Sequence, residues 1–165
     1  GYDNNEGPSN EQSQALYIDG IRQAVLWASK RAVLLGLENQ EDGYVDSSTV
    51  AIKIINEIQS PYLHLYMDIG NLIVKGLDAL EEVKAAKGYL YGVHVKDARP
   101  GEPRRVPFGE GNVPFARIFS QLAFDGFSGP MMIEMWNDGK CDSLQICAQA
   151  YKWLFEQLKY AGFKV

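Results

Sequence analysis

Four short apolar segments of the chain each end in a side chain that can bind a metal ion or transfer a proton. The four end residues, in chain order, are Glu38, Asp68, His94 and Glu134. The segments before them are rich in leucine, valine and aromatic residues, a composition that favours buried strands. Ionisable residues at the same end of several strands indicate a shared site, where carboxylates and an imidazole provide metal-binding or acid–base chemistry.

Convergence of these side chains would place three carboxylates close together. Like charges at short distance repel one another and raise the carboxyl pKa values unless a cation neutralises them. One divalent metal ion is the simplest such cation, and oxygen ligands with a single imidazole suit Mn²⁺, Mg²⁺, Co²⁺ or Zn²⁺ without selecting among them. Any one of the acids is equally well explained as a helix cap or a loop salt bridge, but four successive strand ends favour a site.

Five helices are predicted between and around these strands. Periodic apolar positions, capping residues and prolines place helices and strands in alternation. The predicted helices span about 11–30, 50–58, 77–86, 115–124 and 143–160, and the strands span 33–38, 63–68, 90–97 and 130–134. We also expect a turn at residues 69–71, and burial of Leu16, Ile21, Val25 and Trp27 in the first helix.

Strands that alternate with helices indicate a parallel sheet, whose sites lie at the carboxyl ends of its strands. Four strand–helix units are half of a (β/α)8 TIM barrel, a fold of ~250 residues, and 165 residues are too few to close one. We therefore predict a single α/β domain over residues 1–165, the C-terminal half of a (β/α)8 TIM barrel, with the N-terminal half missing. The alternative is an open four-stranded α/β domain. There, ligands gather where the strand order reverses, whereas every strand end of a barrel points to one centre.

Composition and charge argue against several classes of protein. The chain carries a formal net charge of −5, whereas a nucleic-acid surface is built from clustered Lys and Arg. No segment approaches the ~20 apolar residues of a membrane span, and the polar first residues lack the apolar region of a signal peptide. Cys141 and Cys147 have no metal or redox spacing. We therefore expect a reduced, cytoplasmic protein that binds neither nucleic acid nor membrane.

Five segments of the chain together resemble the C-terminal half of a known enzyme family. These segments are residues 37–39, 66–71, 92–97, 106–111 and 129–136. The family is that of the L-xylulose-5-phosphate 3-epimerases, also named L-ribulose-5-phosphate 3-epimerases and often described as hexulose-6-phosphate isomerases, within the xylose-isomerase-like TIM barrels. The resemblance extends over essentially the whole chain. Its His-Val-Lys-Asp, Pro-Phe-Gly-Glu-Gly and Ile-Glu-Met-Trp segments are specific in combination.

The resemblance implies a metal-dependent sugar-phosphate epimerase. One divalent ion would be held by Glu38, Asp68, His94 and Glu134, and Glu38 and Glu134 would be the acid/base pair on opposite faces of the substrate. The enzyme would interconvert L-xylulose 5-phosphate and L-ribulose 5-phosphate at C3, removing a proton from one face and returning one to the other. The carbon acid is weak, so a metal would be needed to stabilise the enediolate. The sequence does not determine which glutamate deprotonates which epimer.

The phosphate group of such a substrate needs a cationic or backbone site, and the fifteen-residue loop after the third strand contains three arginines. A loop of this length usually has a function. Lys96 and Arg99 are the predicted phosphate ligands, because they lie closest to the strand end. Arg104 and Arg105 are at least as well explained as solvated loop charges. Asn71 is predicted either to bind a sugar hydroxyl or to shape its turn.

Other functions stay open at this point. An aldose–ketose isomerase acting on hexulose phosphates or other sugars, or a sugar dehydratase of the same superfamily, would use the same metal ligands and differ in product. The multi-zinc abasic-site endonuclease type is disfavoured, because the chain has two histidines and an acidic balance. A non-catalytic half-barrel that binds a partner is the alternative from another class. Activity of the isolated half-barrel is doubtful, and assembly into a homo-oligomer is expected.

Overall fold

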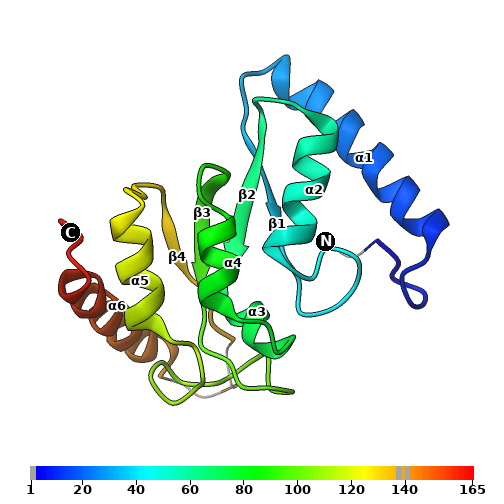
Figure 1. Cartoon of the computed structure of the whole chain (residues 1–165). Helices are drawn as coiled ribbons and strands as arrows, with labels where there is room; N and C mark the ends of the chain where they lie inside the picture. Colours follow the sequence, from blue (N-terminus) through cyan, green and yellow to red (C-terminus); the bar gives the residue numbers. More distant parts are fainter. Residues whose placement is uncertain (1–2, 137–138, 140–141) are drawn as a thin grey trace.

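The computed structural model describes residues 3–136, 139 and 142–165, which form alternating helices and strands (Figure 1). The strands are β1 (Leu35–Glu38), β2 (Leu63–Asp68), β3 (Leu90–Val95) and β4 (Met131–Ile133). The helices are α1 (Glu11–Ser29), α2 (Ser48–Ile58), α3 (Ile69–Val74), α4 (Ala79–Ala85), α5 (Phe115–Phe124) and α6 (Ser143–Tyr160). None of the helices in the described residues has the length and apolarity needed to cross a membrane. The predicted alternation is confirmed, with element ends that differ by a few residues.

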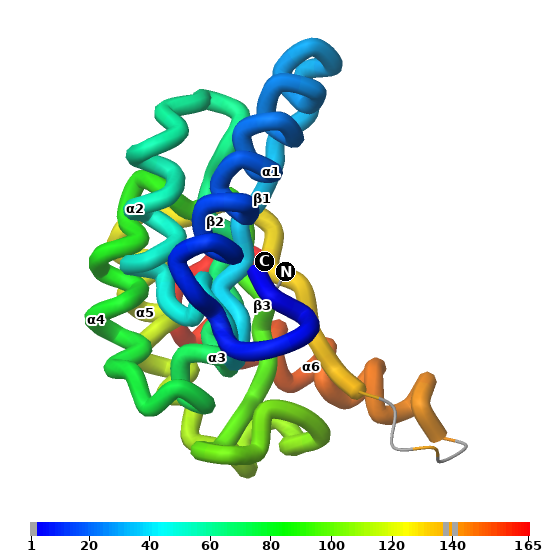
Figure 2. Tube along the Cα trace, turned by 90° about the vertical axis from the view of Figure 1, so that its right-hand side faces the viewer, coloured from blue at the N-terminus to red at the C-terminus, as the bar shows by residue number. Residues whose placement is uncertain are grey.

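The described strands form one parallel sheet in the order β1-β2-β3-β4, so each strand pairs with the next one along the chain. This order contains no reversal, which distinguishes it from a doubly wound sheet and matches consecutive strands of a (β/α)8 barrel. Helices α2, α4 and α5 lie side by side along one face of the sheet (Figure 2). The predicted half of a (β/α)8 barrel is therefore confirmed over the open alternative.

The face of the sheet that packs against the helices is apolar. Successive strand residues point to opposite faces, so Leu63, Leu65 and Met67 of β2 share this one, and each is at most 2% exposed. Val93 and Val95 of β3 continue the same layer and are fully buried. The helices contribute a matching set of fully buried or nearly fully buried side chains: Ile54, Val83, Ile118, Phe119 and Leu122. This core holds the strands in register, and the register positions the residues of the other face.

The opposite face, which we call the inner face, carries His64, Tyr66 and Asp68 of β2. A Cβ atom placed on Gly36 of β1 would lie 2.8 Å from a Tyr66 side-chain atom, and one on Gly92 of β3 would lie 2.5 Å from the ring. The two glycines therefore leave the space that the tyrosine occupies. The ring centroids of Tyr66 and His94 are 4.6 Å apart, in an edge-to-face arrangement. The Tyr66 ring thus packs against the His94 imidazole and supports it.

Two local predictions are wrong. Residues 69–71 begin helix α3 instead of forming an isolated turn, because the carboxylate of Asp68 accepts hydrogen bonds from the N–H groups of Gly70 and Asn71 and caps the helix. Leu16 and Trp27 of α1 are each 65% exposed, although both were expected to be buried. Helix α1 lies at the β1 edge of the sheet (Figure 1), where the described elements cover only one side of it.

The outer edges of β1 and β4 pair with no other described strand, and apolar side chains near them are open to solvent. Leu34, directly before β1, and Met132 of β4 are 43% and 57% exposed. Unpaired strand edges and apolar patches favour association. We predict that a polypeptide of these 165 residues, prepared alone, dimerises or aggregates. Size-exclusion chromatography with light scattering tests this, and a soluble monomer with cooperative unfolding would contradict it.

Candidate metal centre

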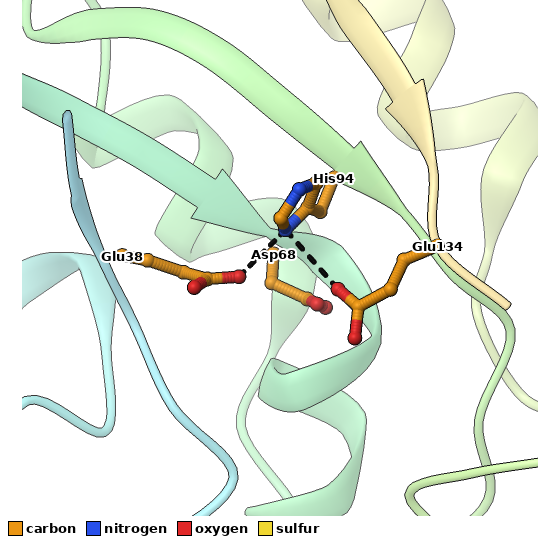
Figure 3. Close-up of side chains that lie close together, drawn as sticks. All are labelled: Glu38, Asp68, His94 and Glu134. Carbon is orange, nitrogen blue, oxygen red and sulfur yellow. Dashed lines mark hydrogen bonds and ion pairs between the residues drawn. The ribbon is translucent and has the colours of Figure 1, made fainter. Parts of the chain in front are cut away.

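The four side chains predicted from the strand ends converge at the carboxyl ends of the sheet (Figure 3). Glu38 ends β1, Asp68 ends β2, His94 lies next to the end of β3 and Glu134 follows β4. One potential ligand atom of each lies within 4.8 Å of the others. Parallel pairing explains this convergence: Asp68 is in register with His94, and the N–H of Glu134 donates to the Val95 carbonyl oxygen over 3.0 Å.

His94 lies between the two glutamates. Its Nδ1 is 2.6 Å from Oε1 of Glu38 and 3.1 Å from Oε2 of Glu134, as the dashed lines in Figure 3 show. Hydrogen bonding to Glu134 and to Glu38 raises the pKa of His94 to about 9, against a partial burial that lowers it. In the absence of metal the imidazole is therefore protonated at neutral pH, and its positive charge offsets the two carboxylates.

Lys96 supplies a second positive charge to the cluster of Glu38, Asp68, His94 and Glu134. Its Nζ is 2.7 Å from Oδ1 of Asn71, 3.2 Å from Oδ2 of Asp68 and 3.4 Å from Oε1 of Glu134. Burial raises the pKa of Asp68 to about 7, although Lys96 acts in the opposite direction. Burial also opposes ionisation of Glu134, but hydrogen bonds with His94 and Asp68 and the charge of Lys96 lower its pKa to about 2. Near neutral pH Asp68 is therefore only partly ionised, whereas Glu134 is ionised.

Asp68 has one carboxylate oxygen that the fold uses and one that it does not. Oδ1 accepts from the N–H groups of Gly70 and Asn71 at 2.8 and 2.9 Å. Oδ2 is buried and accepts no hydrogen bond from the described residues, so its neighbour at 3.2 Å, the Lys96 ammonium, is only an ionic contact. A buried carboxylate oxygen without a hydrogen-bond donor is stabilised by nearby positive charge, which Lys96 supplies in part and a bound metal ion would complete. The residues present therefore fit one divalent ion, which would replace the proton on His94.

Asn39 and Asn71 hold the loops next to the cluster in place. Asn39 is fully buried, and its side chain accepts from the N–H of Asp68 and donates to the Asp68 carbonyl oxygen, both at 2.9 Å. Asn71 donates to the carbonyl oxygen of Asn39 over 2.9 Å. These bonds join the end of β1 to the start of α3 and orient the Asp68 carboxylate. Asn39 was not predicted as a site residue, because its partner lies 29 residues along the chain.

The three predicted substrate-binding residues are placed differently. Lys96 and Asn71 lie together under the cluster, and both are 2% exposed with their polar atoms already engaged. Arg99 is held within its own loop, where its guanidinium donates to the carbonyl oxygen of Glu110 and to the Glu102 carboxylate. The loop folds back on itself through an Arg99–Glu102 bridge, which directs this arginine to its own loop. Direct contact of these residues with a substrate stays a prediction.

Asp97 is a further site residue that sequence reasoning did not single out. Its buried carboxylate accepts from the N–H groups of Ala98, Gly109, Gly111 and Val113, at 2.9 to 3.4 Å. A Cβ on Gly111 would lie 2.0 Å from Oδ1 of Asp97, so this position requires glycine. The two ends of the long loop are therefore tied to the end of β3. An acid directly after a strand, followed by a loop with spaced glycines, is the signal that could have identified it.

Trp136, which follows β4, contacts the cationic side chains of Lys96 and Arg104. Lys96 Nζ is 5.0 Å and the Arg104 guanidinium carbon is 5.1 Å from the Trp136 ring centroid, within range of cation–π attraction. Arg104 also forms an ion pair with Glu41, which lies in the loop after β1. Loops that follow three different strands are thus joined at the carboxyl edge of the sheet.

Comparison with known proteins now places the fold in a family. Residues 1–157 match a family model described as the xylose isomerase-like TIM barrel. The chain belongs to this family. Membership confirms the barrel interpretation of the four-stranded parallel sheet formed by the described residues. It also agrees with the position of the cluster, because family barrels carry their sites at the carboxyl ends of the strands.

Curated relatives and solved structures agree with the resemblance stated above. The chain is 35% identical over 162 residues to the L-ribulose-5-phosphate 3-epimerases UlaE of Escherichia coli O139:H28 and Escherichia fergusonii, covering 98% of this chain and 57% of each relative. A structure of L-ribulose 3-epimerase aligns with a TM-score of 0.82 and 17% identity, covering 94% of this chain and 57% of that one. D-Allulose 3-epimerase from Methylomonas sp. aligns with a TM-score of 0.80 and 18% identity, covering 93% and 58%. The chain therefore spans little more than half the length of the proteins it matches.

The raised pKa of His94 predicts how the stability of the metal-free protein depends on pH. A folded-state pKa of about 9, above the ordinary value of 6.5, contributes stability below pH 6.5 that is lost as the pH rises through 9. Asp68 acts in the same direction up to its pKa of about 7. We expect the thermal midpoint to fall by several degrees between pH 6.5 and 9, measured by calorimetry with a chelator present.

Saturation with a divalent ion should flatten this dependence, because the ion takes over the neutralisation of the carboxylates. The variant His94→Gln should lose the decrease above pH 7, whereas His64→Gln, whose Nε2 contacts the Pro61 carbonyl oxygen, should retain it. A thermal midpoint that rises with pH in the metal-free protein would contradict the raised pKa assigned to His94.

Proposed function

We propose that this chain supplies the metal-binding and acid/base side chains of a ketopentose-phosphate 3-epimerase that interconverts L-xylulose 5-phosphate and L-ribulose 5-phosphate. The observation that carries the proposal is the placement of Glu38 and Glu134. They enter the cluster from the first and last strands of the described sheet, and lie on either side of His94 (Figure 3). The relatives named as L-ribulose-5-phosphate 3-epimerases support the choice of substrate.

Two carboxylates on opposite sides match the chemistry of epimerisation. A carbon beside a ketone is inverted when a base removes its proton from one face and an acid delivers a proton to the other face. Glu38 and Glu134 could each serve one face. Lys96, 3.4 Å from Glu134, holds that carboxylate in place.

A divalent ion fits the same four residues. Glu38, Asp68, His94 and Glu134 would hold one ion of Mn²⁺, Mg²⁺, Co²⁺ or Zn²⁺, with the open Oδ2 of Asp68 as one of its ligand atoms. When bound, it would supply Lewis-acid stabilisation of negative charge on the ketone oxygen of the substrate. The protein's own contribution is orientation: Asn39 and Asn71 fix Asp68, and Tyr66 supports His94.

The remaining strands of the barrel would come from a second half, either earlier in the same polypeptide or in another chain. The relatives are longer than this chain: 98% of this chain aligns to 57% of the length of each relative. This difference in length supports the proposal. An aldose–ketose isomerase acting on hexulose phosphates would use the same ligands, and the products distinguish the two activities. Cytoplasmic location and assembly into a homo-oligomer stay predictions.

The acid/base proposal predicts the behaviour of two variants in protein that carries both barrel halves. Glu38→Gln or Glu134→Gln should lower epimerisation by about 10²–10⁴-fold or more, because a positioned acid/base contributes this much. Solvent deuterium should enter the substrate at C3 during turnover by the unaltered enzyme. Coupled assays and proton NMR in D₂O measure both.

The matched control is Glu156→Gln, on the exposed surface of α6, which should retain full activity. Inversion at C3 without deuterium incorporation would rule out the proton-transfer route. Conversion to an aldose in place of the epimer would support the isomerase alternative.

A further inference from the structure

Lys96 is a buried cation at the metal cluster, and the surrounding structure is built around its side chain. It follows β3 directly, and its side chain is 3% exposed. The aliphatic stem packs against the start of α3, where a Cβ atom on Gly70 would lie 3.1 Å from both Cγ and Cε of the lysine. Glycine at position 70 therefore leaves the space that the stem occupies. The position of the lysine is thus fixed by the fold.

The ammonium group at the end of this stem is held by one neutral and two charged partners. Oδ1 of Asn71 accepts a hydrogen bond from Nζ over 2.7 Å. Nδ2 of the same amide donates to the carbonyl oxygen of Asn39, so the amide oxygen is the end that faces the lysine. The charged partners are Oδ2 of Asp68 at 3.2 Å and Oε1 of Glu134 at 3.4 Å. The Nζ atom is therefore held between two carboxylates.

The two carboxylates that face Lys96 also belong to the candidate metal ligands. Glu134 directs Oε1 to Lys96 and Oε2 to Nδ1 of His94, 3.1 Å away (Figure 3). Oδ2 of Asp68 has the lysine as its ionic contact and accepts no hydrogen bond from the described residues. A divalent ion bound by these residues would therefore share the negative charge of two carboxylates with the ammonium. Two cations that share the same anionic neighbours repel each other.

Lys96 changes the net charge of the site that would hold the ion. The three clustered carboxylates carry three negative charges when ionised, and a divalent ion beside a neutral His94 would supply two positive charges. The ammonium of Lys96 supplies the third. The loaded site would therefore be neutral with the lysine, and would carry one excess negative charge without it. Removal of a proton beside a ketone creates further negative charge, which an already anionic site would destabilise.

We propose that Lys96 is a positioning residue that balances the charge of the metal centre, weakening its affinity for the divalent ion while favouring the anionic transition state of epimerisation. The second effect rests on the proposed epimerase function, whereas the first depends only on the placement of the charges. The two effects have opposite signs. A residue that only supported the shape of the cluster would, when removed, weaken metal binding and catalysis together.

Two substitutions test the proposal in protein that carries both barrel halves. Lys96→Met keeps an unbranched stem without the charge, and Lys96→Gln keeps a donor for Asn71. Each should lower the Kd for Mn²⁺, measured by calorimetric titration at low ionic strength, by about tenfold, because the repulsion between neighbouring cations is removed. With Mn²⁺ saturating, each should lower kcat for L-ribulose 5-phosphate by about 10-fold to 100-fold, because the transition state loses a nearby positive charge.

Replacement of the lost charge and a matched control complete the experiment. Ethylammonium chloride should restore part of kcat in Lys96→Ala and weaken its Mn²⁺ binding, because Lys96 lines a cavity of about 580 Å³ that can admit the amine. Sodium chloride at the same concentration should not restore kcat. Lys87 provides the control, since its Nζ lies 2.8 Å from the Asp125 carboxylate near the amino end of β3. Lys87→Met should leave both kcat and the Kd for Mn²⁺ unchanged.

Weaker or unchanged binding of Mn²⁺ after removal of the charge would overturn the charge-balancing role of Lys96, and either variant decides this if the other fails to fold. Tighter binding with an unchanged kcat would overturn the effect on the transition state. If the unaltered enzyme binds Mn²⁺ but does not epimerise L-ribulose 5-phosphate, the proposed function fails. A gain in Mn²⁺ affinity in the variants would then still establish the effect of Lys96 on metal binding.

Discussion

The confinement of three carboxylates and one imidazole within 4.8 Å of one another is the constraint on which the rest of this structure depends. Such a group is unstable without positive charge, because carboxylates at this distance repel one another in a partly buried site. The protein offsets this in two ways, through a protonated His94 between Glu38 and Glu134 and through the buried ammonium of Lys96. With both positive charges in place, Oδ2 of Asp68 still accepts no hydrogen bond from the described residues. A divalent ion resolves all of these features together.

The fold provides the geometry that makes this confinement possible. Parallel strands end at one edge of the sheet, and the pairing of consecutive strands brings Asp68 into register with His94. Glycines at positions 36 and 92 admit the Tyr66 ring, which supports His94, while Asn39 and Asn71 link the loops beneath. The apolar core between the sheet and its helices maintains this register. Structural residues and candidate metal ligands thus alternate along the same strands.

The sequence predicted the strands and the four clustered residues, because period-two apolar segments ending in ionisable residues depend on local information. It did not predict the roles of the loop residues. Arg104 pairs with Glu41, 63 positions away, and Asp97 binds N–H groups up to 16 positions further on. Contacts of this kind depend on tertiary packing. Proximity to the strand end favoured Arg99 as a phosphate ligand, but the loop folds back and directs its guanidinium to Glu102 and Glu110.

We propose that one divalent ion is bound by Glu38, Asp68, His94 and Glu134. Crystals of protein carrying both barrel halves, grown with Mn²⁺ and measured at the manganese absorption edge, test it most directly. We expect a single anomalous peak surrounded by these four side chains, with water or substrate completing the coordination and one metal equivalent by elemental analysis. A metal-free site in such crystals, with the four side chains pointing apart, would contradict it.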